Sequence, residues 1–304
     1  MFCLWTNDVE ETSIWLNRLR YETGKKVLVE GMPRLLDIYS KYNIKCTFFI
    51  TGYMAQEFPD IVKMILPFGH EVACHGFSHK LEDAFDILPL DKQIEQLRKS
   101  KAILENLSGQ EVISFRAPAL RVNEFTPIAL NETGFKIDSS VASQRFDLFF
   151  SHGGIKKLKW LVSPRNPYKT APDNLFKTGD GNIVEVPLSA FIFPFTSTTM
   201  RIFPAVTRMQ ARIINIESRK KNKPVVFDIH PNELIDESNE ERIINRRSKN
   251  FLAYFIKDYL RSKMKVENLG EKCIPIYESL IRYFQKKDYT MLTLKDYCKD
   301  RGLI

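Results

Sequence analysis

The chain has 304 residues, a length that suits either one large barrel or two ordinary domains. With 44% hydrophobic and 27% charged residues, its composition is that of a globular protein with a substantial core, which excludes general disorder. The formal charge of +8 predicts attraction to an anionic partner, but the basic runs at 219–221 and 246–247 lack the interleaved glycines and aromatics of a nucleic-acid module, so no nucleic-acid partner is expected.

The first half of the chain alternates short apolar runs with helical patterns, as βα units around a parallel sheet or barrel do. The apolar runs predict strands over residues 2–6, 46–51, 71–74, 113–115 and 135–137. Apolar residues at helical spacing predict helices over residues 32–42, 54–66, 91–107 and 124–132. We therefore expect an α/β fold.

The second half continues this series less regularly. Further strands are predicted over residues 183–186, 225–229 and 289–293. Amphipathic helices are predicted over residues 248–265 and 275–286, and a closing helix follows the last strand. The less regular stretches 139–182 and 188–223 have the character of insertions over a site. Because no linker isolates a second domain, we expect one domain over residues 1–304, with insertions at about 139–223 and 236–288.

Polar side chains stand at the ends of the expected strands. Five of them directly follow an apolar run: Asp8, His75, Arg116, Asp138 and His230. Parallel sheets and barrels place their functional sites at the carboxyl ends of the strands, so we expect these side chains to lie together.

The cysteines and the N-terminal residues indicate the cellular compartment of the protein. Five widely spaced cysteines form neither a CxxC pair nor a disulfide ladder, which favours reduced, buried thiols. The N-terminal run MFCLWTNDVEE reaches acidic residues too early for a signal peptide, and no run stays apolar for the ~20 residues of a spanning helix. These features predict a cytoplasmic protein.

The run EVACHGFSH holds two histidines, His75 and His79, four positions apart, so both imidazoles can lie on one face of a helical turn. Two neutral imidazoles presented together are good ligands for zinc, nickel, cobalt or iron. The alternative is a pair of structural histidines, since this spacing also arises by chance.

The run TNDVE carries the first strand directly into Asp8 and Glu10, which cannot be buried cheaply without a cation or hydrogen-bond donors. One carboxylate can bind a metal while the other removes a proton from water. The alternative is a helix cap followed by the negative charges that a helix N-terminus favours.

In the run VVFDIHPNEL, His230 follows an apolar strand and precedes a proline. A histidine there can be the general acid that protonates a departing amine. The alternative is a core histidine bonded to a backbone carbonyl. His70, in a turn, and His152, before two glycines, are weaker candidates.

Taken in order, the runs TNDVE, HGFSH, SFRAP, IDSS and DIHP resemble the successive motifs of the NodB-type polysaccharide deacetylase family. The resemblance covers roughly residues 1–235, and the terminal YTMLTLKDYC is similar to the closing strand and helix of the family. The stretch EGMPRLLDIYSKYNIKCTFFITG resembles members that act on lipid-linked or short glycans. The resemblance implies a deformed (β/α) barrel, usually with fewer than eight strands.

In this family two histidines and an acidic residue hold one divalent metal, which implies His75, His79 and Glu10 here. Val9 stands where many members have the acidic ligand, and members with an Asp-x-Glu arrangement place that ligand one residue later. The implied ion is zinc, with cobalt, nickel or iron as other candidates. In an alternative alignment Asp8 is the ligand and Asn7 replaces the base, which predicts an impaired or altered enzyme.

The other motifs imply the remaining site residues. By resemblance, Asp8 is the catalytic base, Arg116 pairs with it and orients it, and His230 is the catalytic acid. Asp138 and Pro118 match runs that contribute to substrate binding, although the aromatic residue that usually follows the aspartate is absent.

The resemblance implies a metal-dependent carbohydrate deacetylase that removes N-acetyl groups from an amino sugar in a glycan. Because no export signal is seen, the expected substrate is a nucleotide-linked or lipid-linked biosynthetic intermediate. Two rival functions are an amidase acting on a small non-sugar amide and a non-catalytic glycan-binding protein of the same fold.

The aromatic segment 191–203, followed by Arg208, Arg212 and the basic run 219–221, has two interpretations. It can rest on an anionic membrane surface, which would bring a cytoplasmic enzyme to the inner membrane and to a lipid-linked sugar. The alternative is a packed lid over the barrel, since amphipathic stretches normally face their own core.

Overall fold

The computed structural model of the chain describes residues 1–143, 162–242 and 259–304. The strands in these ranges are β1 (Phe2–Val9), β2 (Thr12–Ser13), β3 (Arg18–Leu19), β4 (Thr47–Ile50), β5 (Glu71–Cys74), β6 (Ser114–Phe115), β7 (Ile137–Asp138), β8 (Tyr168–Ala171), β9 (Asn174–Thr178), β10 (Val184–Glu185), β11 (Ala190–Phe191), β12 (Phe193–Pro194), β13 (Val225–Ile229) and β14 (Thr290–Met291).

The α-helices of the same ranges are α1 (Tyr21–Lys26), α2 (Met32–Lys41), α3 (Gly52–Glu57), α4 (Asp60–Ile65), α5 (Leu90–Ser108), α6 (Thr126–Glu132), α7 (Ser197–Ile202), α8 (Pro204–Lys221), α10 (Arg261–Lys265), α11 (Cys273–Gln285) and α12 (Leu294–Asp300). A π-helical segment, η1 (Val27–Gly31), joins α1 to α2, and short 3₁₀ turns are η2 (Leu66–Phe68), η3 (Leu81–Asp83), η4 (Pro118–Leu120), η6 (Pro231–Leu234) and η8 (Gly270–Lys272). None of the described helices is both long and apolar enough to span a membrane.

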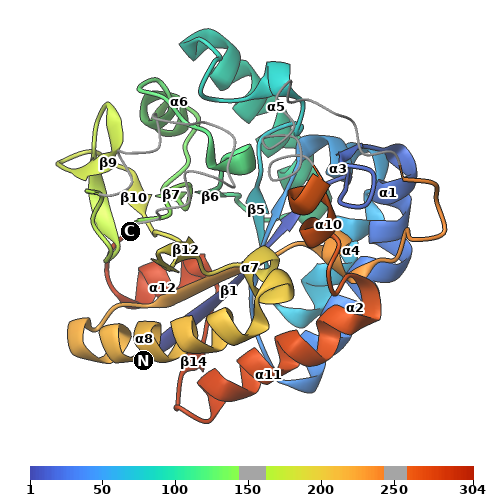
Figure 1. Ribbon diagram of the computed structural model, residues 1–304. Coiled ribbons are helices and arrows are strands. Elements are labelled where there is room, and N and C mark those ends of the chain that lie inside the picture. The colour runs from blue at the N-terminus through green and yellow to red at the C-terminus, as the bar shows by residue number, and fades with distance from the viewer. Residues whose placement is uncertain (144–161, 243–258) are drawn as a thin grey trace.

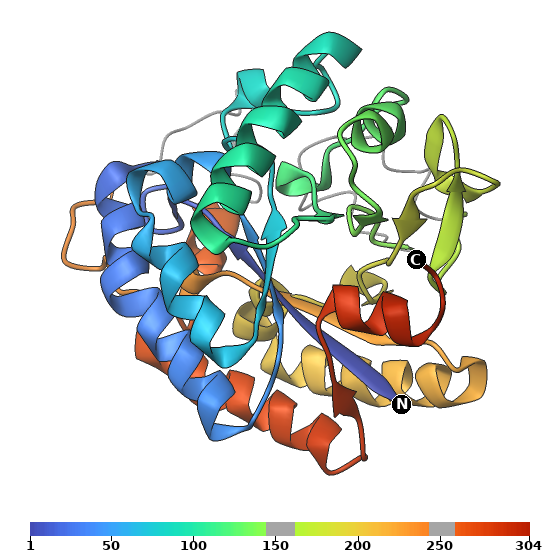
Figure 2. The ribbon, with the colours of Figure 1, turned by 180° about the vertical axis from the view of Figure 1, so that it is seen from behind.

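The described residues form a ten-stranded mixed sheet that curls into a half-barrel with helices around its outside (Figures 1 and 2). Its order is β13-β1-β4-β5-β6-β7-β10-β8-β9, and β14 pairs with the start of β1. All pairings from β13 to β10 are parallel, whereas β8 and β9 add an antiparallel hairpin at the edge. The expected deformed (β/α) barrel is therefore confirmed.

The chain between β10 and β13 extends the wall of this half-barrel. The amide of Ser189 donates to the carbonyl of Val226 over 3.1 Å, and Thr196 forms an isolated parallel bridge with Asp228. Next along the chain, α7 and α8 pack against the outside of β13. The stretch 188–223, which we expected to lie over the site as an insertion, thus begins as part of the barrel wall.

Aromatic side chains fill the space between the sheet and the outer helices. Trp5 of β1 contacts three rings edge to face, with centroid distances of 5.3 Å to Phe227, 5.5 Å to Tyr277 and 6.2 Å to Phe284. The central strands β1, β4, β5 and β13 are covered on both faces, by the barrel interior and by helices, so they are buried along nearly their whole length and mostly apolar. This burial explains why continuous apolar runs predicted the strands.

Several elements differ in extent from their prediction. β1 continues three residues beyond its expected end, so Asp8 lies inside the strand rather than after it. The expected helix 54–66 is two helices, α3 and α4, because Pro59 has no amide hydrogen for a continuous ladder. The helical segments α1 and η1, which precede α2, were not predicted because their glycines and β-branched residues lower helix propensity. Most of the expected helix 248–265 lies outside the described residues.

Candidate functional site

Alternation along β1 separates the side chains of the first motif. In a strand, successive side chains point to opposite faces, so Asp8 and Asn7 diverge. The Asn7 side chain donates to the carbonyl of Thr47 over 3.2 Å and accepts from the Tyr39 hydroxyl. Asn7 is thus held on the other face of the sheet, and the alignment that makes it the substituted base has no support from its position.

Glu10, His75 and His79 come together after the ends of β1 and β5. Their ligand atoms all lie within 4.8 Å of one another. The Nε2 atoms of His75 and His79 are 3.0 Å apart, and a carboxylate oxygen of Glu10 contacts Nε2 of His79. The structure therefore groups the three residues that the sequence indicated as metal ligands.

The surroundings of this group fit a divalent metal. Nδ1 of His75 lies 2.8 Å from the carbonyl oxygen of Arg116; because a carbonyl only accepts, Nδ1 carries the proton and the Nε2 lone pair faces the group. Burial lowers the pKa of His75 to about 4, which keeps this imidazole neutral. Oε2 of Glu10, the oxygen that contacts Nε2 of His79, is buried and accepts no hydrogen bond of regular geometry among the described residues. Two imidazoles and one carboxylate are a donor set for zinc, cobalt, nickel or iron.

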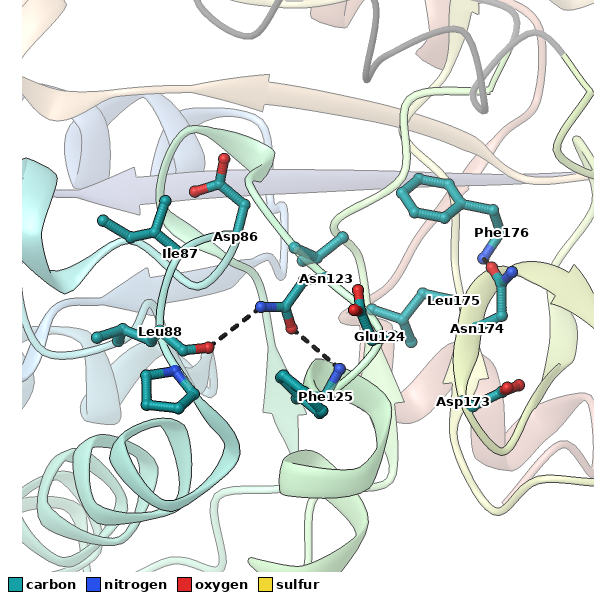
Figure 3. Close-up of a pocket in the computed structure, with 12 residues that line it drawn as sticks. Asp86, Ile87, Leu88, Asn123, Glu124, Phe125, Asp173, Asn174, Leu175 and Phe176 are labelled. Carbon is teal, nitrogen blue, oxygen red and sulfur yellow. Dashed lines mark hydrogen bonds between the residues drawn. The ribbon is translucent and has the colours of Figure 1, made fainter.

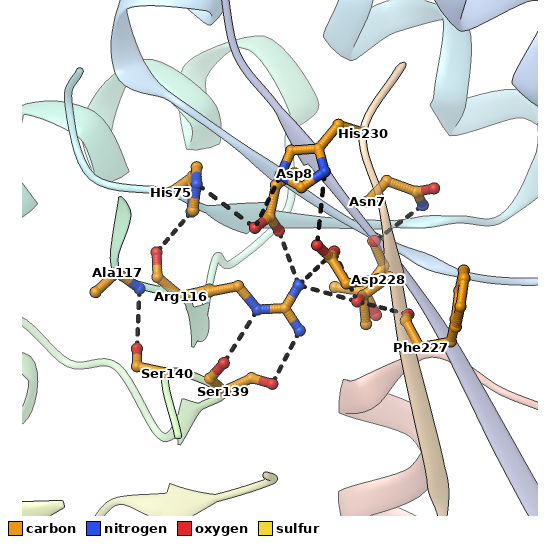
Figure 4. Close-up of polar contacts among 12 residues, drawn as sticks. Asn7, Asp8, His75, Arg116, Ala117, Ser139, Ser140, Phe227, Asp228 and His230 are labelled. Carbon is orange, nitrogen blue, oxygen red and sulfur yellow. Dashed lines mark hydrogen bonds and ion pairs between the residues drawn. The ribbon is translucent and has the colours of Figure 1, made fainter. Parts of the chain in front are cut away.

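Beside this group, the fully buried Arg116 connects two carboxylates (Figure 4). Its Nη1 is 2.8 Å from Oδ1 of Asp8 and 2.7 Å from Oδ1 of Asp228. Its Nε and Nη2 donate to the carbonyl and hydroxyl oxygens of Ser139, each over 3.0 Å, and its guanidinium lies over the ring of Phe49. These contacts fix the guanidinium in one orientation, as expected of a residue that positions Asp8.

The two carboxylates that share Arg116 differ in their affinity for protons. Burial opposes the ionisation of Asp8, but the charges of Arg116 and two histidines lower its pKa to about 2. Burial and the neighbouring charge of Asp8 raise the pKa of Asp228 to about 7. Asp8 is thus fully ionised at neutral pH, whereas Asp228 is ionised only in part.

His230 stands at the end of β13 with acidic groups on both sides of its ring. Its Nε2 lies 4.0 Å from Oδ2 of Asp8, and its Nδ1 lies 3.8 Å from Asp228 and 3.7 Å from Glu233. Burial lowers the pKa of His230, but Asp228 and Glu233 raise it well above its usual value. The imidazole is therefore protonated at neutral pH, which is the state that a general acid needs.

Three residues of this arrangement were missed at the sequence level. Asp228 lies in β13, two positions before His230, whose backbone is still extended, so alternation places both side chains on the same side of the sheet and could have indicated Asp228. Glu233 lies on the turn η6 after His230, and it forms a buried ion pair with Arg201 of α7 at 2.8 Å. No sequence signal connects Arg201 to this region, since the pair joins segments that are 32 residues apart.

The two expected substrate-binding residues are both buried. Asp138 is wholly inaccessible, and its Oδ1 accepts from the hydroxyl of Ser140, which in turn accepts from the amide of Ala117. Its carboxyl thus braces the loop after Arg116, and its burial gives no support to direct contact with substrate. Pro118 packs in the same loop against Gly76, where an added Cβ would lie 3.2 Å from the proline ring.

The two weaker histidine candidates lie apart from this site. Nδ1 of His70 accepts from the amide of Cys46 over 3.3 Å and the ring stacks among aromatic side chains, so it is a core histidine. His152 lies outside the described residues.

A separate cavity of about 510 Å³ opens between the loops after β5 and β6 and the turn of the β8–β9 hairpin (Figure 3). Asn123 shapes its wall by donating to the carbonyl of Leu88 over 3.1 Å and accepting from the amide of Phe125 over 3.0 Å. None of the motif residues lines this cavity, although two of its walls belong to loops that carry them.

The fold and the donor set define a deformed (β/α)-barrel protein with a two-histidine, one-carboxylate group at the carboxyl ends of its strands. A family model described as polysaccharide deacetylase matches residues 11–137. This match lies in the part of the chain whose ordered motifs resemble the polysaccharide deacetylase family. His75, His79 and Arg116 lie inside the matched range, whereas Asp8 and His230 lie outside it.

Two relatives illustrate the similarity. The chain is 27% identical to a peptidoglycan deacetylase of Helicobacter pylori over 53% of this chain and 54% of the relative. It is 30% identical to a peptidoglycan deacetylase-like protein of Gibberella zeae over 58% of this chain and 51% of the relative. The chain thus spans about half the length of these curated relatives.

Solved structures share the fold over nearly the whole chain. A structure assigned as a polysaccharide deacetylase of Pseudomonas aeruginosa superposes with a TM-score of 0.61 at 14% identity, covering 97% of this chain and 90% of that chain. A corresponding structure from Mycobacterium smegmatis gives a TM-score of 0.56 at 22% identity, covering 96% and 92%. At these identities the likeness concerns the fold.

Proposed function

We propose that the chain is a carbohydrate deacetylase that removes N-acetyl groups from an amino sugar of a glycan. The observation that carries this proposal is the position of Asp8, whose carboxylate lies between Arg116, His75 and His230. The ionised Asp8 and the protonated His230 thus face each other, 4.0 Å apart, next to the group of Glu10, His75 and His79. General-base and general-acid catalysis of amide hydrolysis uses two groups in this relation.

Glu10, His75 and His79 would hold a divalent ion, zinc in our proposal, whose chemistry when bound is polarisation of the amide carbonyl and activation of water. Arg116 is paired with Oδ1 of Asp8, so Oδ2 would accept the proton of the attacking water. The C–O bond to the water oxygen forms first and makes the amide carbon tetrahedral, and the C–N bond breaks in the following step.

His230 supplies the proton for the leaving nitrogen. Its Nδ1 faces Asp228 and Glu233, so its Nε2 points toward Asp8 and the reacting group. Donation from Nε2 to the leaving nitrogen yields acetate and a free amine. Asp228 and Glu233 stabilise the imidazolium until that transfer.

We further propose a lipid-linked or nucleotide-linked sugar as the substrate, met at an anionic inner membrane surface on the cytoplasmic side. Exposed apolar side chains near the site support the lipid-linked form: Phe191, Ile192 and Phe203 flank α7, whose Arg201 reaches Glu233. The net charge of +8 would attract the phosphates of either form.

His75→Ala tests the function. The variant should lose bound metal, measured by elemental analysis, and also lose acetate release from an N-acetylated chitooligosaccharide, a peptidoglycan fragment or a linked sugar donor. His70→Ala is the matched control, because His70 is a buried histidine outside the site and its loss should leave both measurements unchanged. Full acetate release by His75→Ala would refute the proposal.

The same assays separate the two rival functions. Bound metal with hydrolysis of a small cyclic or linear amide, but without acetate release from any sugar, would identify an amidase. Glycan binding with neither metal nor hydrolysis would identify a non-catalytic binding protein.

A further inference from the structure

Two outer helices, α8 and α11, lie side by side along one flank of the barrel (Figure 1). A groove of about 510 Å³ runs between them. Its lining combines an apolar floor with basic edges and consists of Pro204, Thr207, Arg208, Ala211, Arg212, Pro275, Ile276, Ser279, Leu280, Arg282, Tyr283 and Lys286. The proposed deacetylase site plays no part in this groove.

The charge around the groove has one sign. Four basic residues line it and no acidic residue does. Helix α8 carries five basic residues and one acidic residue, a net charge of +4, which is half of the +8 of the whole chain. That acidic residue, Glu217, is already paired with Lys223 at 2.8 Å and with Arg165 at 2.6 Å. Among the described residues, Arg208 and Arg212 are exposed and have no ion pair.

Apolar side chains are interleaved with these arginines on the outward face of α8. Met209 and Ile216 are 51% and 53% exposed, more than a side chain that packs against the barrel would be. Helical spacing places them on the same face as Arg208, Arg212 and Arg219. An exposed helix face that mixes arginines with large apolar side chains is typical of helices that lie in a membrane interface.

We propose that the face formed by α8 and α11 binds the surface of an anionic lipid bilayer. Arg208, Arg212 and the basic residues of the α11 side pair with headgroup phosphates, while Met209 and Ile216 enter the boundary with the acyl chains. A lipid surface satisfies both the charge and the exposed apolar side chains, whereas a soluble anion would satisfy the charge alone. This docking would also bring the start of α8, next to α7, to the lipid.

Vesicle sedimentation tests this surface with the full chain. The protein should bind vesicles of phosphatidylcholine with about 30% phosphatidylglycerol, should not bind pure phosphatidylcholine, and should lose binding as salt is raised. The double variant Arg208→Glu with Arg212→Glu should bind the anionic vesicles at least about tenfold more weakly. A matched double variant, Lys92→Glu with Arg98→Glu on α5 across the molecule, should bind as the wild type does.

Tryptophan fluorescence tests whether the apolar side chains of α8 enter the bilayer. The fluorescence of an Ile216→Trp variant should shift to shorter wavelength with anionic vesicles, whereas an Ile87→Trp variant, at a residue equally exposed elsewhere, should not shift. Absence of binding to anionic vesicles would overturn the proposal, as would equal losses in both charge-reversal variants. If the α8 variant instead separates a dimer seen by analytical ultracentrifugation, the face binds a second copy and the proposal is wrong.

Discussion

Two carboxylates only two residues apart in the first motif have different neighbours. Asp8 is bound to Arg116 and has a pKa of about 2, held there by that guanidinium and two histidines against the effect of burial. Glu10 instead contacts Nε2 of His79 through Oε2, a buried oxygen that accepts no hydrogen bond of regular geometry among the described residues. The neighbours thus suggest separate tasks, a base at Asp8 and a ligand at Glu10.

Paired substitutions separate these tasks. Asp8→Asn should retain the metal but lower kcat about 10²–10⁴-fold, because the amide cannot accept the proton of water. Glu10→Gln should weaken metal binding by more than the about 10–100-fold that an outer-shell substitution costs. Metal titration and acetate release measured on both variants check this; the reverse pattern would make Asp8 the ligand.

A second prediction concerns the buried carboxyls of Asp138 and Glu185, which stand opposite each other where β7 pairs with β10. Burial and the charge of Asp138 raise the pKa of Glu185 well above its usual value, so folding favours the protonated acid and the wild type loses stability as pH rises above 4.5. Glu185→Gln does not titrate, keeps an oxygen for the amide of Val141 and supplies a donor to Asp138.

Glu185→Gln should therefore raise the free energy of unfolding by about 1–3 kcal/mol at pH 8. This gain should shrink toward pH 4. Urea unfolding of both proteins across that range is the measurement. A destabilised variant at pH 8 would show that the wild-type pair is ionised and stabilising.

At the residue scale, strand ends and motif spacing were sufficient to indicate His75, His79, Glu10 and Arg116, which the structure brings together. Asp228 and Glu233 were overlooked because each lies beside the histidine that drew attention. Burial could not be read from the sequence: the carboxyl of Asp138 is fully buried and faces the carboxyl of Glu185. The assignment of Asp138 to substrate binding stays a prediction.

Among the elements, α8 is connected to the segment before β8 by an ion cluster. Oε2 of Glu217 forms ion pairs with Nη2 of Arg165 at 2.6 Å and with Nζ of Lys223 at 2.8 Å. Burial opposes ionisation of Glu217, but the hydrogen bonds from these two basic side chains lower its pKa to about 2. The cluster therefore holds the outer helix to the edge of the sheet through charge.

Acid should weaken this cluster in a defined window. The folded pKa of Glu217 lies below its ordinary value of 4.5, so its stabilisation is present above pH 4.5 and is lost as pH falls toward 2. Glu217→Gln should be less stable than the wild type at pH 6, and the two should converge near pH 2. Thermal unfolding at a series of pH values measures this, and a constant difference would show that the charge of Glu217 is not responsible.

Element prediction was most successful where apolar periodicity was strong, as in α2, α5, α11 and β13. It failed for η1, because two valines and a glycine lower the helix propensity of this segment. The glycine is explained by a close approach of two segments, since a Cβ on Gly31 would lie 2.4 Å from the carbonyl oxygen of Pro231. Such contacts between distant segments cannot be read from local sequence.

For the molecule as a whole, a bound metal should stabilise the fold. Any ligand that binds the native state alone adds about 2.7 kcal/mol when present at 100 times its Kd. Zinc should therefore raise the melting temperature of the wild type, and a chelator should reverse the rise. His75→Ala should show no response to either addition, and an equal response in that variant would place the metal elsewhere.

The overall architecture followed from the alternation of strands and helices, but the extension of the barrel wall did not. Residues 188–196 were expected to form part of an insertion, because short irregular segments carry no period, yet Ser189 and Thr196 bridge to β13. That the whole chain is a single domain stays a prediction.

Arg116 has one further consequence, for how activity could be lost in evolution. Its side chain joins β1, β13 and the loop after β7 from inside the barrel, and the backbone next to it follows β6. A substitution there would leave two buried carboxylates without their cation and would disturb two separate pairs of adjacent strands, β13 with β1 and β6 with β7. A descendant that abandons catalysis while remaining folded would therefore retain this arginine and change Asp8 or His230 first.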